Sequence, residues 1–183
     1  KQDAACAAWP EKRRRLADAF RRLEDAEYYP TTAYAAVRDP RKDLFRYMER
    51  QYQGADLIGL GVASFSYLDG VHQQNLPSLD PYLASLATGQ LPLGRAYALS
   101  RDEQAVRSFV LQLKLGVVSR KDFRDRHAVD PAERFGEEIA SAVASGWLTL
   151  DHAAVRTTRE GRMHVDRMIP RFYLSAHRER IAG

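Results

Sequence analysis

The sequence predicts a fold of two classes in order, α/β and then α+β: a partial parallel α/β barrel remnant, followed by a winged-helix-like, mostly helical carboxy-terminal domain. The first prediction comes from helix-like segments that alternate with two strand-like runs, at residues 28–37 and 55–66, an order typical of a parallel sheet with crossover helices. The second comes from the last part of the chain, where three helical segments precede two short strands and a final helix. Two helix–strand units cannot close a barrel of about eight strands, so the sheet is either small and open or incomplete in this sequence.

The first helix is predicted from Pro10 to Ala26, because proline suits a first helical turn and the apolar residues that follow have helical spacing. Residues 28–37 are rich in aromatic and β-branched side chains and are predicted to form a strand. Arg38-Asp39-Pro40 ends this strand, and a second helix is expected over residues 43–52.

The run of residues 55–66 is nearly continuous in apolar and small residues, which is typical of a strand buried on both faces of a parallel sheet. In a parallel barrel the functional site lies at the carboxyl ends of the strands. We therefore expect the site near Ser64 and Ser66 and along the loop that continues to Asn75.

Residues 76–99 are predicted to be a linker, because glycine and proline punctuate them and only one short helix, at residues 80–88, is expected. This prediction divides the chain into a barrel portion at residues 1–75, the linker, and a winged-helix-like domain at residues 100–183.

The helices of the last domain are predicted from their start signals. Ser100 and Glu103 have the spacing of a capping box, Ser119 precedes a short helix, and Asp130 begins another that ends at Gly146. The first and third of these helices carry an apolar stripe at helical spacing, and the second holds Phe123.

The strands of the same domain are predicted at residues 147–150 and 154–157, joined by a short turn, and a final helix is expected over residues 159–169. Three helices, a β-ribbon and a last helix together predict a winged-helix-like module.

Composition narrows the function classes. The net charge is +4 with both signs interspersed, which indicates a solvated surface more than a nucleic-acid-binding stripe. No apolar run approaches the roughly 20 residues that span a bilayer. The single cysteine, Cys6, excludes a disulfide framework within the chain and any cluster or zinc site built on several of its own thiolates. It is compatible with the cytoplasm, where we expect the protein.

The candidate binding residues lie around the end of the predicted buried strand. Gly59 and Gly61 would let a backbone or a cofactor approach closely, or would let a neighbouring helix pack tightly. The polar residues His72, Gln74 and Asn75 follow, and they either bind a carboxylate or amino-acid group or satisfy their own exposed backbone.

Tyr97 and the histidines are further candidates. Tyr97 would cover the site as a ring with a polar tip, or pack at a domain interface. As an acid, base or metal ligand, His72 lacks visible partners in the sequence. The other histidines are scattered through the second domain and are expected to be exposed: His127, His152, His164 and His177. No nucleophile elbow, phosphate loop or metal-ligand spacing is present.

Several segments, taken in order, resemble the oxygen-independent coproporphyrinogen III oxidase-like family of radical S-adenosylmethionine proteins. Residues 54–66, with Gln74-Asn75 and residues 95–100, resemble the last barrel strand and following linker of that family. Residues 147–174 resemble its carboxy-terminal domain. Within the latter the resemblance rests on two runs, Thr158-Arg159-Glu160-Gly161-Arg162 and Arg171-Phe172-Tyr173-Leu174.

The resemblance implies that the chain is the carboxy-terminal piece of a radical enzyme of anaerobic porphyrin chemistry, an oxidoreductase. It implies S-adenosylmethionine and a 4Fe-4S cluster for the full-length parent, but no cofactor in this chain, because the three-cysteine motif is absent. The piece alone is therefore expected to be inactive, with no catalytic or metal-binding residue. Its expected partners are the missing amino-terminal barrel and a tetrapyrrole or other small substrate.

The position of the candidate residues near the end of the predicted strand gives them their roles in such a site, and of these residues Gln74 and Asn75 also fall on the family pattern. Gly59, Gly61, Ser64 and Ser66 are expected on the cofactor side of the site. A second group is expected on the substrate side: His72, Gln74, Asn75 and Tyr97.

The sequence is also compatible with two alternative functions. One is a non-catalytic module that binds tetrapyrrole or docks a partner. The other is nucleic-acid binding through the winged helix, which is disfavoured because the helix over residues 131–145 carries three glutamates against Arg134 alone, and acids oppose phosphate contacts.

Overall fold

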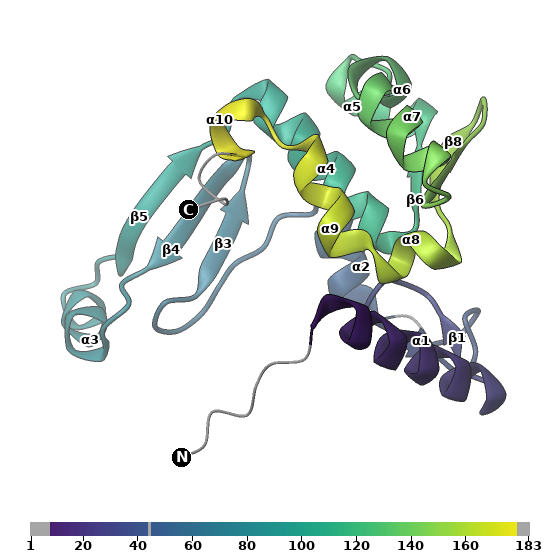
Figure 1. Cartoon of the computed structure of the whole chain (residues 1–183). Coiled ribbons are helices and arrows are strands. Elements are labelled where there is room, and N and C mark those ends of the chain that lie inside the picture. Colours follow the sequence, from purple (N-terminus) through teal and green to yellow (C-terminus); the bar gives the residue numbers. More distant parts are fainter. Residues whose placement is uncertain (1–7, 44, 179–183) are drawn as a thin grey trace.

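The computed structural model describes residues 8–43 and 45–178. Figure 1 shows a three-stranded sheet, with a short helix at its far end, beside a larger part made mostly of helices. A long helix, α4 (Arg101–Leu115), runs between the two parts and contributes to both.

The chain begins with α1 (Trp9–Asp25), which has Pro10 in its first turn as predicted. The strand predicted over residues 28–37 is instead a small antiparallel hairpin of β1 (Tyr29–Pro30) and β2 (Ala36–Val37).

The cause of that difference is a turn in the middle of the run. The hydroxyl Oγ1 of Thr32 accepts the Tyr34 N–H, and the Ala33 N–H donates to the Lys114 carbonyl of α4 at 3.0 Å. These bonds hold Ala33 in the core, so the run cannot remain extended. The helix predicted next is present as α2 (Arg46–Tyr52).

The prediction of a strand at residues 55–66, buried on both faces, is wrong. Ile58 and Leu60 are 68% and 86% exposed, and before β3 begins at Phe65 the described pairing of this run is a single bridge between Leu57 and Tyr67. Positive φ angles at Gly61 (99°) and Ala63 (58°) turn the chain back on itself, so that the segment leads into β3 (Phe65–Leu68).

The sheet that forms has the order β3-β4-β5, with β4 (Val71–Asn75) in the centre and β5 (Leu93–Ala98) at the edge. Both pairings are antiparallel, as are all strand pairings in the described residues, so the expected parallel barrel remnant is not found there. The predicted linker holds the expected helix, α3 (Leu79–Ala87), but it also holds β5. Register places His72 of β4 opposite Tyr97 of β5.

The helical part begins with α4, which is followed by a strand, three short helices and a hairpin. These elements are β6 (Val117–Ser119), α5 (Arg120–His127), α6 (Pro131–Arg134), α7 (Gly136–Ala144), β7 (Leu148–Leu150) and β8 (Ala154–Thr157). The sheet has the order β6-β8-β7 and is antiparallel. The strand pair β7–β8 was predicted, whereas β6 was not. The single helix predicted from Asp130 is interrupted at Phe135.

The remaining chain crosses back over α4, as Figure 1 shows in yellow. The helix predicted over residues 159–169 is divided into α8 (Arg159–Met163) and α9 (Val165–Met168), and it continues as the 3₁₀ helix η1 (Ile169–Phe172). A last turn, α10 (Ser175–Arg178), lies near the end of the sheet.

The hydrophobic core belongs almost entirely to the helical part. At its centre Phe109 of α4 packs on Phe135 and Phe172, with ring centroids 4.4 and 4.9 Å apart. In the sheet of β3–β5, by contrast, Tyr67 is the one apolar side chain that is buried. The described part of the chain contains no helix long and apolar enough to cross a membrane.

Candidate functional site

The predicted cofactor-side residues lie together in the turn that leads into β3. The Gly59 N–H donates to Ser66 Oγ at 3.0 Å, and Ser64 Oγ donates to the Leu60 carbonyl at 2.6 Å. A Cβ at Gly59 would lie 2.3 Å from the Phe65 carbonyl oxygen. Close approach of the chain's own backbone therefore explains this glycine, and the positive φ of Gly61 explains the other.

The two amide side chains of β4 also face this turn. Gln74 Nε2 donates to the Ala63 carbonyl at 3.1 Å, and Asn75 Nδ2 donates to the carbonyls of Gly59 and Gly61 at 3.2 and 2.9 Å. The structure thus brings these two predicted substrate-side residues against the predicted cofactor-side residues, where they hold the turn closed.

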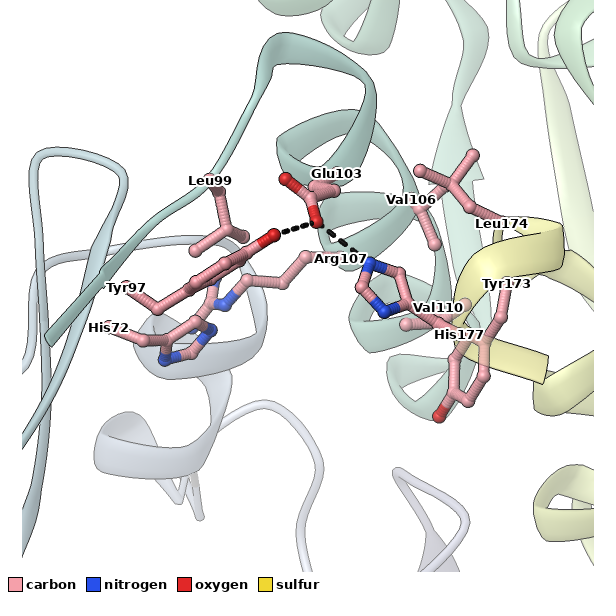
Figure 2. A pocket seen from close by; sticks show the side chains of 10 residues that line it. All are labelled: His72, Tyr97, Leu99, Glu103, Val106, Arg107, Val110, Tyr173, Leu174 and His177. Atoms are coloured by element: carbon pink, nitrogen blue, oxygen red, sulfur yellow. Dashed lines mark hydrogen bonds and ion pairs between the residues drawn. The ribbon is translucent and has the colours of Figure 1, made fainter. Parts of the chain in front are cut away.

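The other two predicted substrate-side residues are elsewhere. His72 and Tyr97 line a pocket of about 310 Å³ between the sheet, α4 and the segment at residues 173–177 (Figure 2). The other lining residues are Leu99, Glu103, Val106, Arg107, Val110, Tyr173, Leu174 and His177. The eight predicted residues therefore divide between a closed turn and an open pocket.

Glu103 occupies one end of this pocket and is fully engaged by donors. Its carboxylate accepts from the Tyr97 hydroxyl at 2.6 Å and from the Ser100 backbone N–H at 2.7 Å, and it contacts His177 Nε2 at 2.7 Å. These hydrogen bonds, that of Tyr97 first, lower the pKa of Glu103 from 4.5 to about 2. The carboxylate is therefore ionised at neutral pH.

Arg107 lies one helical turn further along α4, and its side chain extends toward His72 and Tyr97 (Figure 2). Its guanidinium carbon lies 3.6 Å from the centroid of the Tyr67 ring, and the His72 ring packs on the same tyrosine with centroids 4.9 Å apart. Burial lowers the pKa of His72, and the charge of Arg107 lowers it further, so His72 is neutral at pH 7.

The sequence contains only some of the signals that would identify the residues of this pocket. Glu103 was recognised only as a helix cap, which it is: Ser100 Oγ accepts the Glu103 N–H at 3.2 Å. Arg107 was missed, although its position four residues after Glu103 places both on one side of a helix. Nothing local connects Glu103 with His177, which is 74 residues away.

The expectation that the four other histidines are exposed is correct only for His152. His164 stacks on Trp147 with ring centroids 4.8 Å apart, His127 packs on Phe123 at 4.6 Å, and His177 is half-buried against Glu103. The neighbours of His164 and His177 come from distant segments, which a single sequence does not show, whereas Phe123 lies one turn before His127 in the same helix, α5.

A cluster ligated by several thiolates does not fit this chain, which has one cysteine. That residue, Cys6, lies outside the described residues. Among the residues that are described, no three His, Cys, Asp or Glu side chains are grouped so as to hold a metal ion. The pocket offers hydrogen-bonding groups, the guanidinium of Arg107 and apolar walls. These features suit the binding of a small molecule.

The chain is similar in sequence and in structure to known proteins. Residues 99–164 match the family described as the HemN C-terminal domain. The oxygen-independent coproporphyrinogen III oxidase of Pseudomonas aeruginosa is 26% identical over 148 residues, which cover 74% of this chain and 32% of that protein. The chain thus spans about a third of the length of this curated relative.

The coproporphyrinogen III oxidase HemN of Escherichia coli, a radical SAM enzyme, has a similar structure. The TM-score is 0.74 at 21% identity, and the match covers 93% of this chain and 43% of that one. The chain therefore corresponds to the carboxy-terminal part of a HemN-like protein, with a HemN C-terminal domain at residues 99–164.

Proposed function

We propose that this chain is the carboxy-terminal part of a cytoplasmic radical S-adenosylmethionine oxidoreductase that acts in anaerobic porphyrin and heme biosynthesis. The observation that carries the proposal is the match of residues 99–164 to the HemN C-terminal domain. S-adenosylmethionine and a 4Fe-4S cluster would be held by the part of the parent that lies outside this sequence. The chain itself supplies walls of the site and binds no cluster.

Within that parent, the turn with Gly59, Gly61, Ser64 and Ser66 is proposed to form the wall on the cofactor side. Its internal hydrogen bonds support this role, because a wall that is fixed before the ligand arrives loses no entropy on binding. Gln74 and Asn75, proposed above for the substrate side, would act by holding this wall in place.

The helical domain is proposed to be a lid over the substrate side, where His72 and Tyr97 lie. Its element order supports a winged-helix-like arrangement: a long helix, a strand, three short helices and a hairpin, with β8 between β6 and β7. The first turn of α7 carries Glu137 and Glu138, which disfavours contact with nucleic-acid phosphates.

The proposed partner of the sheet is the amino-terminal barrel of the same protein. Strand β5 is exposed along its whole length. Large apolar side chains near the sheet are exposed as well, among them Ile58, Leu60, Phe65 and Leu93. Apolar surface of this kind is normally covered in a mature protein, and the chain matches only a third of a curated relative.

The experiment that tests the function uses the full reading frame to which this chain belongs. The protein would be purified without oxygen, its cluster reconstituted, and both cleavage of S-adenosylmethionine and decarboxylation of coproporphyrinogen III measured. Both activities are expected, and Asn75→Ala is expected to lower them more than Gln90→Ala, which changes an exposed amide near the same sheet. A reading frame without three closely spaced cysteines would contradict the proposal.

A second candidate function is a non-catalytic module that binds tetrapyrrole or docks a partner. The pocket favours it, because binding there needs no residue outside the chain. Titration of the isolated chain with heme distinguishes the two candidate functions. A saturable absorbance shift supports the non-catalytic module, whereas no shift supports the role as wall and lid of the larger enzyme.

A further inference from the structure

Among the described residues, Arg107 carries a charge without an acidic partner. In the part of the chain that the structure describes, no carboxylate lies within ion-pair distance of its guanidinium, whose main contact is the face of Tyr67. The side chain is partly buried, and burial lowers the pKa of Arg107 below its usual value. A guanidinium nevertheless remains charged in proteins, so this burial costs free energy that a bound anion would offset.

The geometry leaves the hydrogen-bonding edge of the guanidinium available. At 3.6 Å the guanidinium stacks on the tyrosine ring, which occupies one of its faces. The N–H groups lie in the plane of the guanidinium, and a pair of them matches the two oxygens of a carboxylate. His72, neutral and packed on the same Tyr67, can donate one further N–H without adding charge.

Apart from Tyr173, the other described residues of the pocket are apolar or already hydrogen-bonded. Leu99, Val106, Val110 and Leu174 form its walls. Glu103, the one acidic side chain among the described residues that line it, accepts from Tyr97 and Ser100, contacts His177, and stands at the end of the pocket near His177 (Figure 2). The volume of about 310 Å³ is at the lower end of the range for small-molecule pockets, which begins at about 300 Å³.

We infer that this pocket binds a small organic carboxylate with an apolar body, and that the carboxylate pairs with Arg107 while the body lies against the leucine and valine walls. One guanidinium among apolar walls suits a monocarboxylate better than a phosphate, which requires more donors. The inference goes beyond the proposed function, because it requires neither a cluster nor S-adenosylmethionine and concerns a residue that the resemblance does not assign.

The test compares hexanoate with hexanamide, which have the same apolar body and differ in charge. Each would be titrated by calorimetry into the whole chain at about pH 7. Hexanoate is expected to bind saturably and at least about tenfold more tightly than hexanamide, because only hexanoate compensates the guanidinium. This comparison uses the wild-type chain, so it decides the question even if a variant fails to fold.

Variants then test whether Arg107 is responsible for the tighter binding of hexanoate. Arg107→Gln is expected to reduce hexanoate affinity to that of hexanamide. Arg101→Gln, which removes an exposed arginine from the same helix, should leave it unchanged. Arg107→Lys keeps the charge but not the paired N–H groups, and should give an intermediate affinity.

Three results would overturn the inference: no saturable hexanoate binding, equal affinity for the two ligands, or full hexanoate affinity in folded Arg107→Gln. None of them bears on the proposed function, which is measured by catalysis in the full-length protein.

Discussion

At the scale of single residues, the pocket depends on contacts that are distant in sequence. Glu103 begins α4 as a cap and also receives the hydroxyl of Tyr97 from β5 and the ring of His177 from α10. One carboxylate thereby joins the sheet, the long helix and the end of the described chain. The charge state of this residue should therefore affect how the two parts of the molecule are held together.

Glu103→Gln is expected to lower the free energy of unfolding by about 1–2 kcal/mol at pH 7, because glutamine replaces charge-assisted hydrogen bonds with neutral ones. Urea denaturation would measure the change. Asp102→Asn is the matched control, since Asp102 is exposed in the same helical turn. Equal losses in the two variants would show that general helix-terminus charge, and not this network, is responsible.

The same residue predicts a pH dependence with a definite sign. Its pKa in the folded chain is about 2, below its usual value of 4.5, so the folded state holds the ionised form more strongly than the unfolded state does. The stabilisation is complete above pH 4.5 and is lost as the pH falls toward 2. Urea denaturation across this interval should show the loss in wild type and a smaller one in Glu103→Gln. An equal fall in both proteins would assign acid sensitivity to other carboxylates.

At the scale of secondary-structure elements, the sequence predicted the helices and strands whose signals are local. Ser100 and Glu103, Ser119, and Asp130 each cap the helix expected of them. The β7–β8 hairpin was also predicted. The prediction of a buried strand at residues 55–66 is wrong because the apolar composition of this run suggested burial, whereas its conformation is set by glycine turns and by amide hydrogen bonds from a later strand. Strands β5 and β6 were missed because they are defined by their pairing partners.

The division of the eight candidate residues between the closed turn and the pocket was not foreseen, because it depends on which distant segments the side chains of β4 contact. His72 faces α4, while Gln74 and Asn75 bond the turn before β3. Arg107 could not be singled out without knowing which face of α4 the sheet covers.

Contact between helix α8 and the β7–β8 hairpin gives a prediction for one element. Gly161 in α8 has no space for a side chain, because a Cβ there would lie 2.0 Å from the Trp147 carbonyl oxygen and 3.0 Å from Thr157 Cγ2. Gly161→Ala is expected to cost about 2–4 kcal/mol of stability, since backbone on the hairpin must move. Thermal denaturation followed by circular dichroism would measure it.

The control for that variant is Gly136→Ala at the start of α7, where an added Cβ would meet nothing within 4 Å. Alanine favours helix over glycine, so this change should be neutral or stabilising by up to about 1 kcal/mol. If Gly161→Ala proved as harmless as Gly136→Ala, α8 would have to be free to shift away from the hairpin.

At the scale of the whole molecule, the described chain has an uneven distribution of buried surface. The aromatic and aliphatic core extends from α4 to η1, while the sheet of β3–β5 buries Tyr67 and leaves its edge strand exposed. Hydrogen bonds alone contribute little net stability, so the sheet should open more easily than the core. This asymmetry would disappear if the sheet packed against another part of a longer protein.

Hydrogen exchange measured by mass spectrometry tests this asymmetry and the proposed partner together. In the isolated chain, peptides from β3–β5 and α3 should exchange at least about tenfold faster than those from α4 and β8, corresponding to about 1.4 kcal/mol in opening free energy. In the full-length protein the sheet should gain protection, because a barrel packed on Ile58, Leu60 and Phe65 would bury apolar surface that is now exposed. Protection at α5, which lies on the far side of the helical part from the sheet, should not change and serves as the internal reference. Equal exchange of the sheet in both proteins would mean that the barrel docks elsewhere, whereas strong protection in the isolated chain would mean that the sheet is stable without a partner.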